Sequence, residues 1–458
     1  MKSVVFGVIF GLILARSIIY ILPIYIYHYI PEFPDHFCWG IDEMCTNDTN
    51  IYQFHLKIET EEINDLLARL NNTRSFTPAL RETQTQYGLN GDVLKVLINF
   101  IRESYNFTER QSFLNKFPQY TTNIQGLNIH FLHIKSKNKG MVPIVPILLL
   151  HGWPSSVREF YNSVELFESM KNQTKFSFDL VIPSLIGFGY SDGSAKPGFR
   201  VTHAANIMKT LMNRLGYERF VVHGSDWGAI TVTALATLYP DSVIGLHSNF
   251  CLSLRTITLT KLVIGGLWPS AVVEEKYESE LYPLARLFRF LLAESAYFHL
   301  MGTKPDTIGH ILDNNPIGLI TYLFEKFSVG KNKDNIYSTT AGLQHFDLTT
   351  IMDIILFHYW FPKKATTAAR YYCENSSIEG LLSGLHNIPI DTSVPCGCAF
   401  FEDEFIYQPE SFLRDKYPNL IQYNTYPAVG HFAAIEANDV LTKDIILFVN
   451  KLYESNLL

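Results

Sequence analysis

Short apolar runs that end in small or polar residues recur along the middle of the chain, and this pattern most limits the possible folds. Three such runs, at residues 142–150, 178–183 and 220–223, lead to the motifs His151-Gly152-Trp153-Pro154, Gly187-Phe188-Gly189-Tyr190-Ser191 and Gly224-Ser225-Asp226-Trp227-Gly228. Helical patterns follow or separate them, at residues 204–215 and 229–238. Continuous apolar runs are typical of strands covered on both faces, and their alternation with helices indicates βαβ units. The sequence therefore predicts an α/β protein with a mostly parallel central sheet.

The alternation stops near residue 251 and resumes near residue 385, and helical patterns fill the interval. We expect this helical insertion to form a lid over the active site, because loops at the carboxyl ends of parallel strands carry the chemistry. Two more expected strands, at residues 394–401 and 421–426, and a final amphipathic helix follow it. The predicted division is a membrane anchor at 1–30, an N-terminal extension at 31–140, a first core part at 141–250, the lid at 251–384 and a second core part at 385–458.

Three sites at the ends of expected strands carry groups suited to hydrolysis. The motif Gly224-Ser225-Asp226-Trp227-Gly228 has the form of a nucleophile elbow, in which small residues flank an exposed central side chain. On its own, the motif also fits an ordinary turn with an N-capping Asp. An acid within Glu402-Asp403-Glu404 and then His431 follow, and nucleophile, acid and histidine is the chain order of the α/β-hydrolase fold. That fold places its oxyanion hole at the backbone N–H groups of Trp153 and Trp227.

Asp226 occupies the elbow centre, where this fold usually has serine. A carboxylate is ionised at pH 7 and displaces a leaving group at an sp³ carbon, which gives an ester of Asp226 with the substrate. His431, oriented by an acid, then activates water to hydrolyse that ester. Epoxides and haloalkanes fit this chemistry. An epoxide oxygen needs a proton donor such as a neutral tyrosine hydroxyl, and the expected lid is rich in tyrosine.

Nearly the whole chain resembles the microsomal epoxide hydrolase family, which includes juvenile hormone epoxide hydrolases. The likeness rests on Trp39-Gly40, Phe117-Pro118, Gly126-Leu127-Asn128-Ile129-His130-Phe131, the motifs HGWP, GFGYSD and GSDWG, and Gly430-His431-Phe432-Ala433-Ala434. The resemblance implies the α/β-hydrolase fold and conversion of lipophilic epoxides to vicinal diols, in the cis-stilbene-oxide hydrolase class. It implies neither a metal nor an organic cofactor.

The same resemblance assigns roles to five side chains. Asp226 is implied as the nucleophile, His431 as the base and Glu404 as its acid, with Glu402 and Asp403 as close alternatives. Tyr297 and Tyr372 are implied as the lid tyrosines that activate the epoxide oxygen, with Tyr371 as the neighbouring alternative to Tyr372.

Two other functions compete with this prediction. A haloalkane dehalogenase would release halide and would not depend on lid tyrosines. A catalytically silent carrier of lipophilic ligands is disfavoured, because Asp226, His431 and Glu404 are all intact. A serine esterase is disfavoured because Ser225 is offset from the elbow centre.

The N-terminus is apolar from Val4 to Ile30, interrupted by Arg16. Its length is about that of a membrane-spanning helix, so we expect an uncleaved anchor in the endoplasmic reticulum membrane, as in the family. Lys2 precedes the apolar run and acidic residues follow it, so the positive-inside rule places residue 1 in the cytosol and the catalytic part on the other side of the membrane. Members of the family instead have the catalytic part on the cytosolic side, and the orientation is left open.

Composition excludes some partners. The formal net charge is −7 and no basic block occurs, so nucleic acid is not an expected partner. Six cysteines are too few and too scattered for a disulfide framework. Cys38 and Cys45 are expected to pair only in an oxidising compartment, and Cys396 and Cys398 are expected on alternate faces of a strand rather than on a metal.

Overall fold

A mixed sheet forms the centre of the molecule in this computed structural model, which describes residues 37–41, 45, 48–137, 142–170, 174–376 and 384–458. Within these residues nine strands lie in the order β1-β2-β3-β5-β4-β6-β7-β8-β9. From β5 to β9 all neighbours are parallel, as predicted. The strand bounds are β1 Ile51–Phe54, β2 Gln119–Ile124, β3 Leu127–Ile134, β4 Ile144–Leu150, β5 Ser177–Pro183, β6 Phe220–Gly224, β7 Val243–Ser248, β8 Cys396–Phe401 and β9 Leu420–Tyr426.

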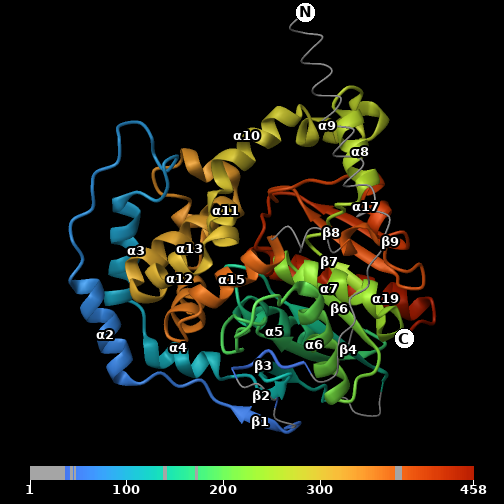
Figure 1. Cartoon of the computed structure of the whole chain (residues 1–458), viewed down its shortest axis with the longest axis horizontal. Helices are drawn as coiled ribbons and strands as arrows, with labels where there is room; N and C mark the ends of the chain where they lie inside the picture. The colour runs from blue at the N-terminus through green and yellow to red at the C-terminus, as the bar shows by residue number, and fades with distance from the viewer. Residues whose placement is uncertain (1–36, 42–44, 46–47, 138–141, 171–173, 377–383) are drawn as a thin grey trace, which may run out of the picture.

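Helices cover both faces of the parallel part of the sheet (Figure 1). The core helices are α5 Tyr161–Ser169, α6 Val201–Arg214, α7 Asp226–Leu238, α17 Glu410–Lys416, α18 Ala433–Glu436 and α19 Asn438–Glu454. Strand β5 is buried at every position, as is β6. Burial on both faces explains why these strands read as continuous apolar runs rather than as alternating ones.

The N-terminal segment adds an antiparallel edge to the sheet, which the sequence did not predict. The sequence pattern of residues 51–134 predicts mainly helices, followed by one extended strand at residues 124–134. Instead β1, β2 and β3 pair antiparallel, and β3 joins β5. Gln125 and Gly126 have φ of +52° and +80° and turn β2 into β3, so the expected strand is a hairpin. The helices of this segment are α2 Thr60–Asn71, α3 Gly91–Glu103 and α4 Phe107–Leu114.

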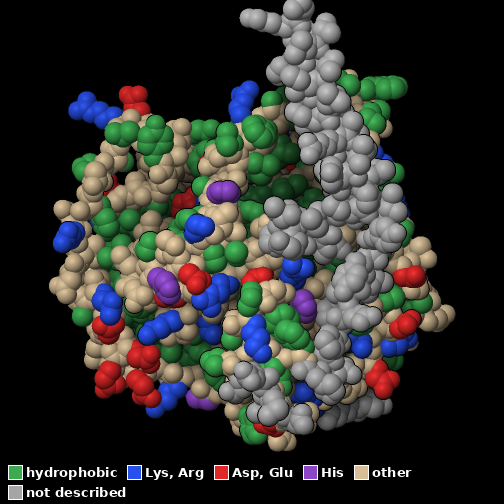
Figure 2. All heavy atoms as spheres, viewed as in Figure 1, with side chains coloured by type: hydrophobic (Ala, Val, Ile, Leu, Met, Phe, Trp, Pro, Cys, Tyr) green, Lys and Arg blue, Asp and Glu red, His purple; other side chains and the backbone are tan. Residues whose placement is uncertain are grey.

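The insertion between β7 and β8 is helical, as predicted, and its two halves differ in burial. The helices of the first half are α8 Thr256–Gly265, α9 Glu275–Leu281, α10 Leu284–Glu294 and α11 Ala296–Thr303. No residue of α10 is buried, and Figure 2 shows hydrophobic side chains at the upper edge, where Figure 1 places this helix. The helices of the second half are α12 Pro305–Asn314, α13 Pro316–Lys331, α14 Leu348–Met352, the π-helix η7 Asp353–Trp360 and α15 Ala365–Ser376.

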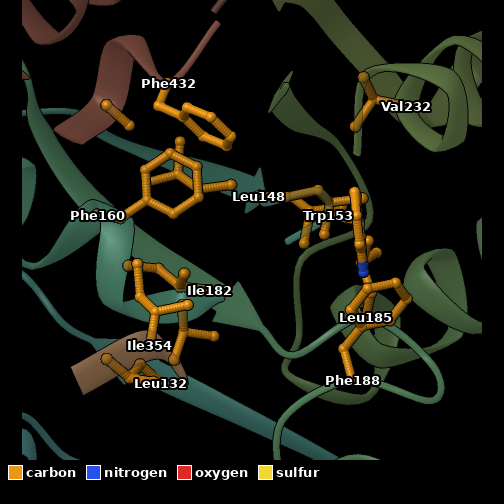
Figure 3. Packing of buried hydrophobic residues seen from close by; sticks show 14 of the residues in the cluster. Leu132, Leu148, Trp153, Phe160, Ile182, Leu185, Phe188, Val232, Ile354 and Phe432 are labelled. Carbon is orange, nitrogen blue, oxygen red and sulfur yellow. The ribbon is translucent and has the colours of Figure 1, made fainter. Parts of the chain in front are cut away.

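All eight residues of the π-helix η7, which belongs to the helical insertion, are buried. Ile354 lies beside Ile182 of β5 and Leu132 of β3 (Figure 3). Asp353 is fully buried and accepts hydrogen bonds from Tyr105 at 2.7 Å, from Arg110 at 2.7 Å and 3.0 Å, and from Arg158 at 2.8 Å. These donors come from the N-terminal segment and from the loop after β4, so one carboxylate ties three parts of the chain together.

The cysteines form two disulfides in the described residues. Cys38 pairs with Cys45, the pairing that the sequence allowed only in an oxidising compartment, and Cys251 pairs with Cys398. The second pairing was not predicted, because 147 positions separate the two residues in sequence. Cys396 is buried and free on the same strand.

The predicted membrane anchor at residues 1–30 lies outside the described residues. Within the part of the chain that the structure describes, no helix combines the length and apolar character needed to cross a bilayer.

Candidate active site

Asp226 lies at a sharp turn between β6 and α7, where the elbow was predicted. Its φ is +47°, a left-handed conformation that is strained for a residue with a side chain. The turn requires glycine on both sides, because a Cβ on Gly224 would collide with the backbone of Gly228, and one on Gly228 with the carbonyl of Leu150. The local sequence therefore positions one carboxylate at the carboxyl edge of the sheet.

His431 lies in the loop after β9 and faces Asp226. Its Nε2 is 3.6 Å from Asp226 Oδ2, and its Nδ1 is 2.9 Å from both carboxylate oxygens of Glu404, which follows β8. His431 and Glu404 are buried. Glu402 is exposed and Asp403 is only half-buried, so the structure brings Glu404 to the histidine rather than either neighbour.

The two carboxylates decide the charge of this histidine. Burial lowers the pKa of His431, but the charges of Glu404 and Asp226 outweigh that effect and raise the pKa to about 10. The imidazolium is therefore the stable form while both carboxylates are ionised. Loss of the charge on Asp226 removes part of this effect and favours the neutral imidazole.

One of the two backbone N–H groups predicted to form the oxyanion hole contacts Asp226. The backbone N–H of Trp153 donates a hydrogen bond of 2.7 Å to Asp226 Oδ1. No hydrogen bond from the Trp227 N–H to Asp226 occurs among the described residues. As the second residue of α7, Trp227 has an N–H without an acceptor inside the helix, so this donor is available to charge that develops on Asp226.

Tyr297 and Tyr372 lie above the elbow and are held by aromatic packing. The Tyr297 ring stacks on Trp153 at 5.1 Å between centroids, and the Tyr372 ring meets Trp153 and Trp227 edge-on at 5.5 Å and 4.9 Å. The two tyrosine rings are 6.1 Å apart. Burial, and then the negative charge of Asp226, raise the pKa of both hydroxyls. Both tyrosines are therefore neutral donors across the physiological pH range.

The neighbouring alternatives point elsewhere. The hydroxyl of Tyr371 pairs with Thr231 Oγ1 of α7 at 3.1 Å. Ser225 is the N-cap of α7, and its hydroxyl donates to Glu159 at 3.0 Å rather than to His431. Ser225 thus lacks a base, as expected from its offset position.

The sequence did not point to Glu159, a buried acid beside the elbow. It lies on the 3₁₀ helix η1 (Val157–Phe160), between Arg158 and Phe160. Burial raises the pKa of Glu159 to about 7. No periodicity or motif distinguishes this acid from a surface glutamate, and only the folded chain shows that it is enclosed.

Comparisons with known proteins cover nearly the whole chain. The family profile described as "Epoxide hydrolase N terminus" matches residues 51–160, and that described as "alpha/beta hydrolase fold" matches residues 145–343. "Juvenile hormone epoxide hydrolase" of Manduca sexta is 39% identical over 425 residues, which cover 92% of this chain and 91% of that protein. "Epoxide hydrolase 1" of Sus scrofa is 37% identical over 419 residues, covering 90% of this chain and 91% of that protein.

Solved structures show the same similarity. The crystal structure of juvenile hormone epoxide hydrolase from the silkworm Bombyx mori aligns with a TM-score of 0.89 at 36% identity, covering 93% of this chain and 100% of that one. The Aspergillus niger epoxide hydrolase aligns with a TM-score of 0.71 at 26% identity, covering 88% of this chain and 97% of that one. With an aspartate at the elbow and similarity along nearly its whole length, the chain belongs to the epoxide hydrolases of the α/β-hydrolase fold, which convert epoxides to diols.

Proposed function

We propose that Asp226 opens the epoxide by forming an ester with one of its ring carbons. The observation that carries this proposal is the position of the carboxylate, with Oδ1 on the Trp153 N–H and Oδ2 facing His431. Oδ2 attacks the carbon, the carbon–oxygen bond of the ring breaks, and Oδ1 becomes the ester carbonyl. Trp153, with Trp227, stabilises the negative charge that later develops on that oxygen.

Tyr297 and Tyr372 donate hydrogen bonds to the epoxide oxygen as the ring opens. Their raised pKa values suit this task, because a neutral hydroxyl donates and a phenolate does not. The departing oxygen gains one proton to become a hydroxyl, and formation of the ester removes the charge on Asp226. His431 then gives up one proton as its pKa falls, so the net charge of the site is unchanged.

In the second step His431 accepts a proton from water, which attacks the ester carbonyl of Asp226. Glu404 stabilises the imidazolium through Nδ1 and keeps Nε2 directed at the ester. The tetrahedral intermediate expels the alkoxide of the substrate, which takes the proton from His431 and leaves as the diol. The carboxyl group of Asp226 then passes its remaining proton to His431, which restores the carboxylate and the imidazolium.

The substrate class we propose is lipophilic epoxides, with a microsomal-type enzyme of the cis-stilbene-oxide class as the first candidate. The aromatic surfaces of Trp153, Trp227, Tyr297 and Tyr372 above the elbow support an apolar substrate. The relatives named juvenile hormone epoxide hydrolase make epoxides of terpenoid hormones a second set to test. Assays with cis-stilbene oxide and with an epoxidised terpenoid ester distinguish the two.

We propose that residues 1–30 anchor the enzyme in the endoplasmic reticulum membrane, where lipophilic epoxides accumulate. The apolar run from Val4 to Ile30 in the sequence supports the proposal. The remaining segments are proposed as an extension at 31–140, a lid at 251–384 and a core in two parts at 141–250 and 385–458. Carbonate extraction of membranes that contain the full chain, compared with a chain lacking residues 1–30, tests the anchor.

The mechanism is tested by a single turnover of detergent-solubilised enzyme with cis-stilbene oxide in H₂¹⁸O. We expect diol with unlabelled oxygen in the first turnover and ¹⁸O in the carboxylate of Asp226, detected by mass spectrometry of the peptide. Label that enters the diol directly, with none in Asp226, contradicts the ester. Release of halide from a haloalkane without any diol from epoxides indicates a dehalogenase instead.

A further inference from the structure

A small, partly open cavity adjoins the reacting groups on the side of η1. Its lining includes Ser155, Glu159, Ser225, Asp226 and His431. Its volume is about 10 Å³, which gives room for about one water molecule. The lining is polar on several sides, as a bound water requires, and it includes both the atom that would be attacked and the base.

Among the residues that line this cavity, Glu159 is an acid whose burial the mechanism described so far does not explain. Its side chain is buried, and its one hydrogen bond to a protein side chain at normal distance is that donated by Ser225, at 3.0 Å. No lysine or arginine pairs with it among the described residues. Asp353, also buried, is by contrast met by two arginines and a tyrosine. The charge of His431, which lines the same cavity, lowers the pKa of Glu159, but in the described part of the chain no ion pair or bidentate hydrogen bond holds this acid as in Asp353. A buried acid held this weakly destabilises the fold, so packing alone does not explain its presence.

Ser155 presents a second unfilled polar group to the same space. Its Oγ is buried and has no hydrogen-bond partner at normal distance, although it lies close enough to Glu159 to lower the pKa of that carboxyl. Tyr359 of η7 donates to the backbone oxygen of Ser155 at 3.2 Å and so fixes this residue in place. A buried hydroxyl without a protein partner is typically satisfied by an ordered water.

We propose that Glu159 and Ser155 hold the water that hydrolyses the Asp226 ester, in the cavity between them and His431. The inference rests on the proposed ester of Asp226. Glu159 accepts a hydrogen bond from one O–H of the water, and His431 accepts the other. These two acceptors leave a lone pair of the water oxygen directed at the ester carbonyl of Asp226.

The step is balanced within the site. The water oxygen forms a bond with the carbonyl carbon of Asp226, and its proton moves to Nε2 of His431. The alkoxide leaves with that proton from His431, the second proton of the water then passes from the new carboxyl group to His431, and Glu159 keeps its own protonation state throughout. Glu159 therefore orients the water and is needed only in the second half of the reaction.

Rapid-quench single turnover of Glu159→Gln separates the two halves. The amide keeps the size of the side chain, but it directs N–H donors at the water. We expect ester formation within about twofold of the parent enzyme and ester hydrolysis slowed by about 10²-fold or more, so the covalent adduct accumulates. Glu165→Gln is the matched control, because this exposed acid on the adjoining α5 pairs with Lys116 at the surface, and both steps should be unchanged.

Ser155→Ala tests the second group without removing a charge. We expect hydrolysis slowed by about tenfold and ester formation unchanged, which also keeps the proposal testable if Glu159→Gln folds poorly. Unchanged hydrolysis in both variants, or equal slowing of both steps, overturns the proposal and indicates a structural role. His431→Gln is measured in the same experiment as a variant that should accumulate the ester. If no ester accumulates in His431→Gln either, the proposed Asp226 mechanism is wrong, and the result does not bear on the water site.

Discussion

The two sides of the active site are held by different forces. On the core side, Asp226, Glu404 and His431 follow strands of the sheet and are fixed by hydrogen bonds and ion pairs. On the lid side, Tyr297 and Tyr372 are placed by stacking and edge-on contacts of aromatic rings. The core side therefore carries the charged groups, and the helical insertion carries neutral tyrosine hydroxyls and aromatic surfaces.

The largest effect is expected from the core side, with Asp226→Asn. An amide is not a nucleophile, so turnover should fall by at least about 10⁴-fold with the fold intact. The measurement is diol formation together with circular dichroism of the purified protein. Slow recovery of activity through deamidation, seen as a mass increase of the peptide, is consistent with the proposal, whereas undiminished activity without such recovery removes Asp226 from the mechanism.

A smaller effect is expected from the lid side, with Tyr297→Phe and Tyr372→Phe combined. Loss of both donors should slow ester formation by about 10²–10³-fold, because the departing oxygen receives no proton or hydrogen bond. Hydrolysis of a preformed ester should change little. Tyr371→Phe is the matched control, since that hydroxyl pairs with Thr231, and an equal loss in this variant would show that the lid tyrosines act through packing.

The buried ion pairs of Asp353, between the helical insertion and the core, are expected to affect the stability of the fold rather than the rate of the reaction. Asp353→Asn leaves Arg110 and Arg158 buried without their anion, so we expect a loss of about 3 kcal/mol in the free energy of unfolding, measured by chemical denaturation. Asp306→Asn, which breaks an exposed pair with Arg370, should cost less than about 1 kcal/mol. An equal loss of unfolding free energy in the two variants would mean that the ion pairs of Asp353 in η7 do not stabilise the contact between the insertion and the core.

The smallest effect concerns the charge of the core. The folded state raises the pKa of His431 to about 10, so its contribution to stability is fully present below about pH 6.5 and is lost as the pH rises through about 10. Asp226→Asn removes one of the two carboxylates responsible. The difference in unfolding free energy between the parent and this variant should therefore shrink between pH 6.5 and 10. If the difference in unfolding free energy between the parent and Asp226→Asn does not change with pH, the charge of Asp226 does not raise the pKa of His431.

The sequence predicted the parallel sheet, and it placed the candidate nucleophile, acid and base after strands of that sheet, because both depend on local signals. A few neighbouring residues suffice to recognise the apolar runs of β4, β5 and β6 and the elbow around Asp226. The same holds for the motifs around Glu404 and His431, whose order along the chain fits the fold. The pairing of β1 with β2 was not, because 64 residues separate the two strands and edge strands carry weak patterns. Glu159 and the bond between Cys251 and Cys398 were missed for the same reason: their environment arises only from contacts distant in sequence.

The disulfide between Cys251 and Cys398 also bears on how the helical insertion can be exchanged between relatives. Cys251 follows β7, where the helical insertion begins, and Cys398 lies inside β8, the strand beside β7; their Cα atoms are 6.0 Å apart. The bond therefore fastens the start of the insertion to the neighbouring core strand. We expect that replacing residues 251–384 with those of a relative, with Cys251 retained, transfers that relative's choice of epoxide while the host keeps its own nucleophile, base and acid.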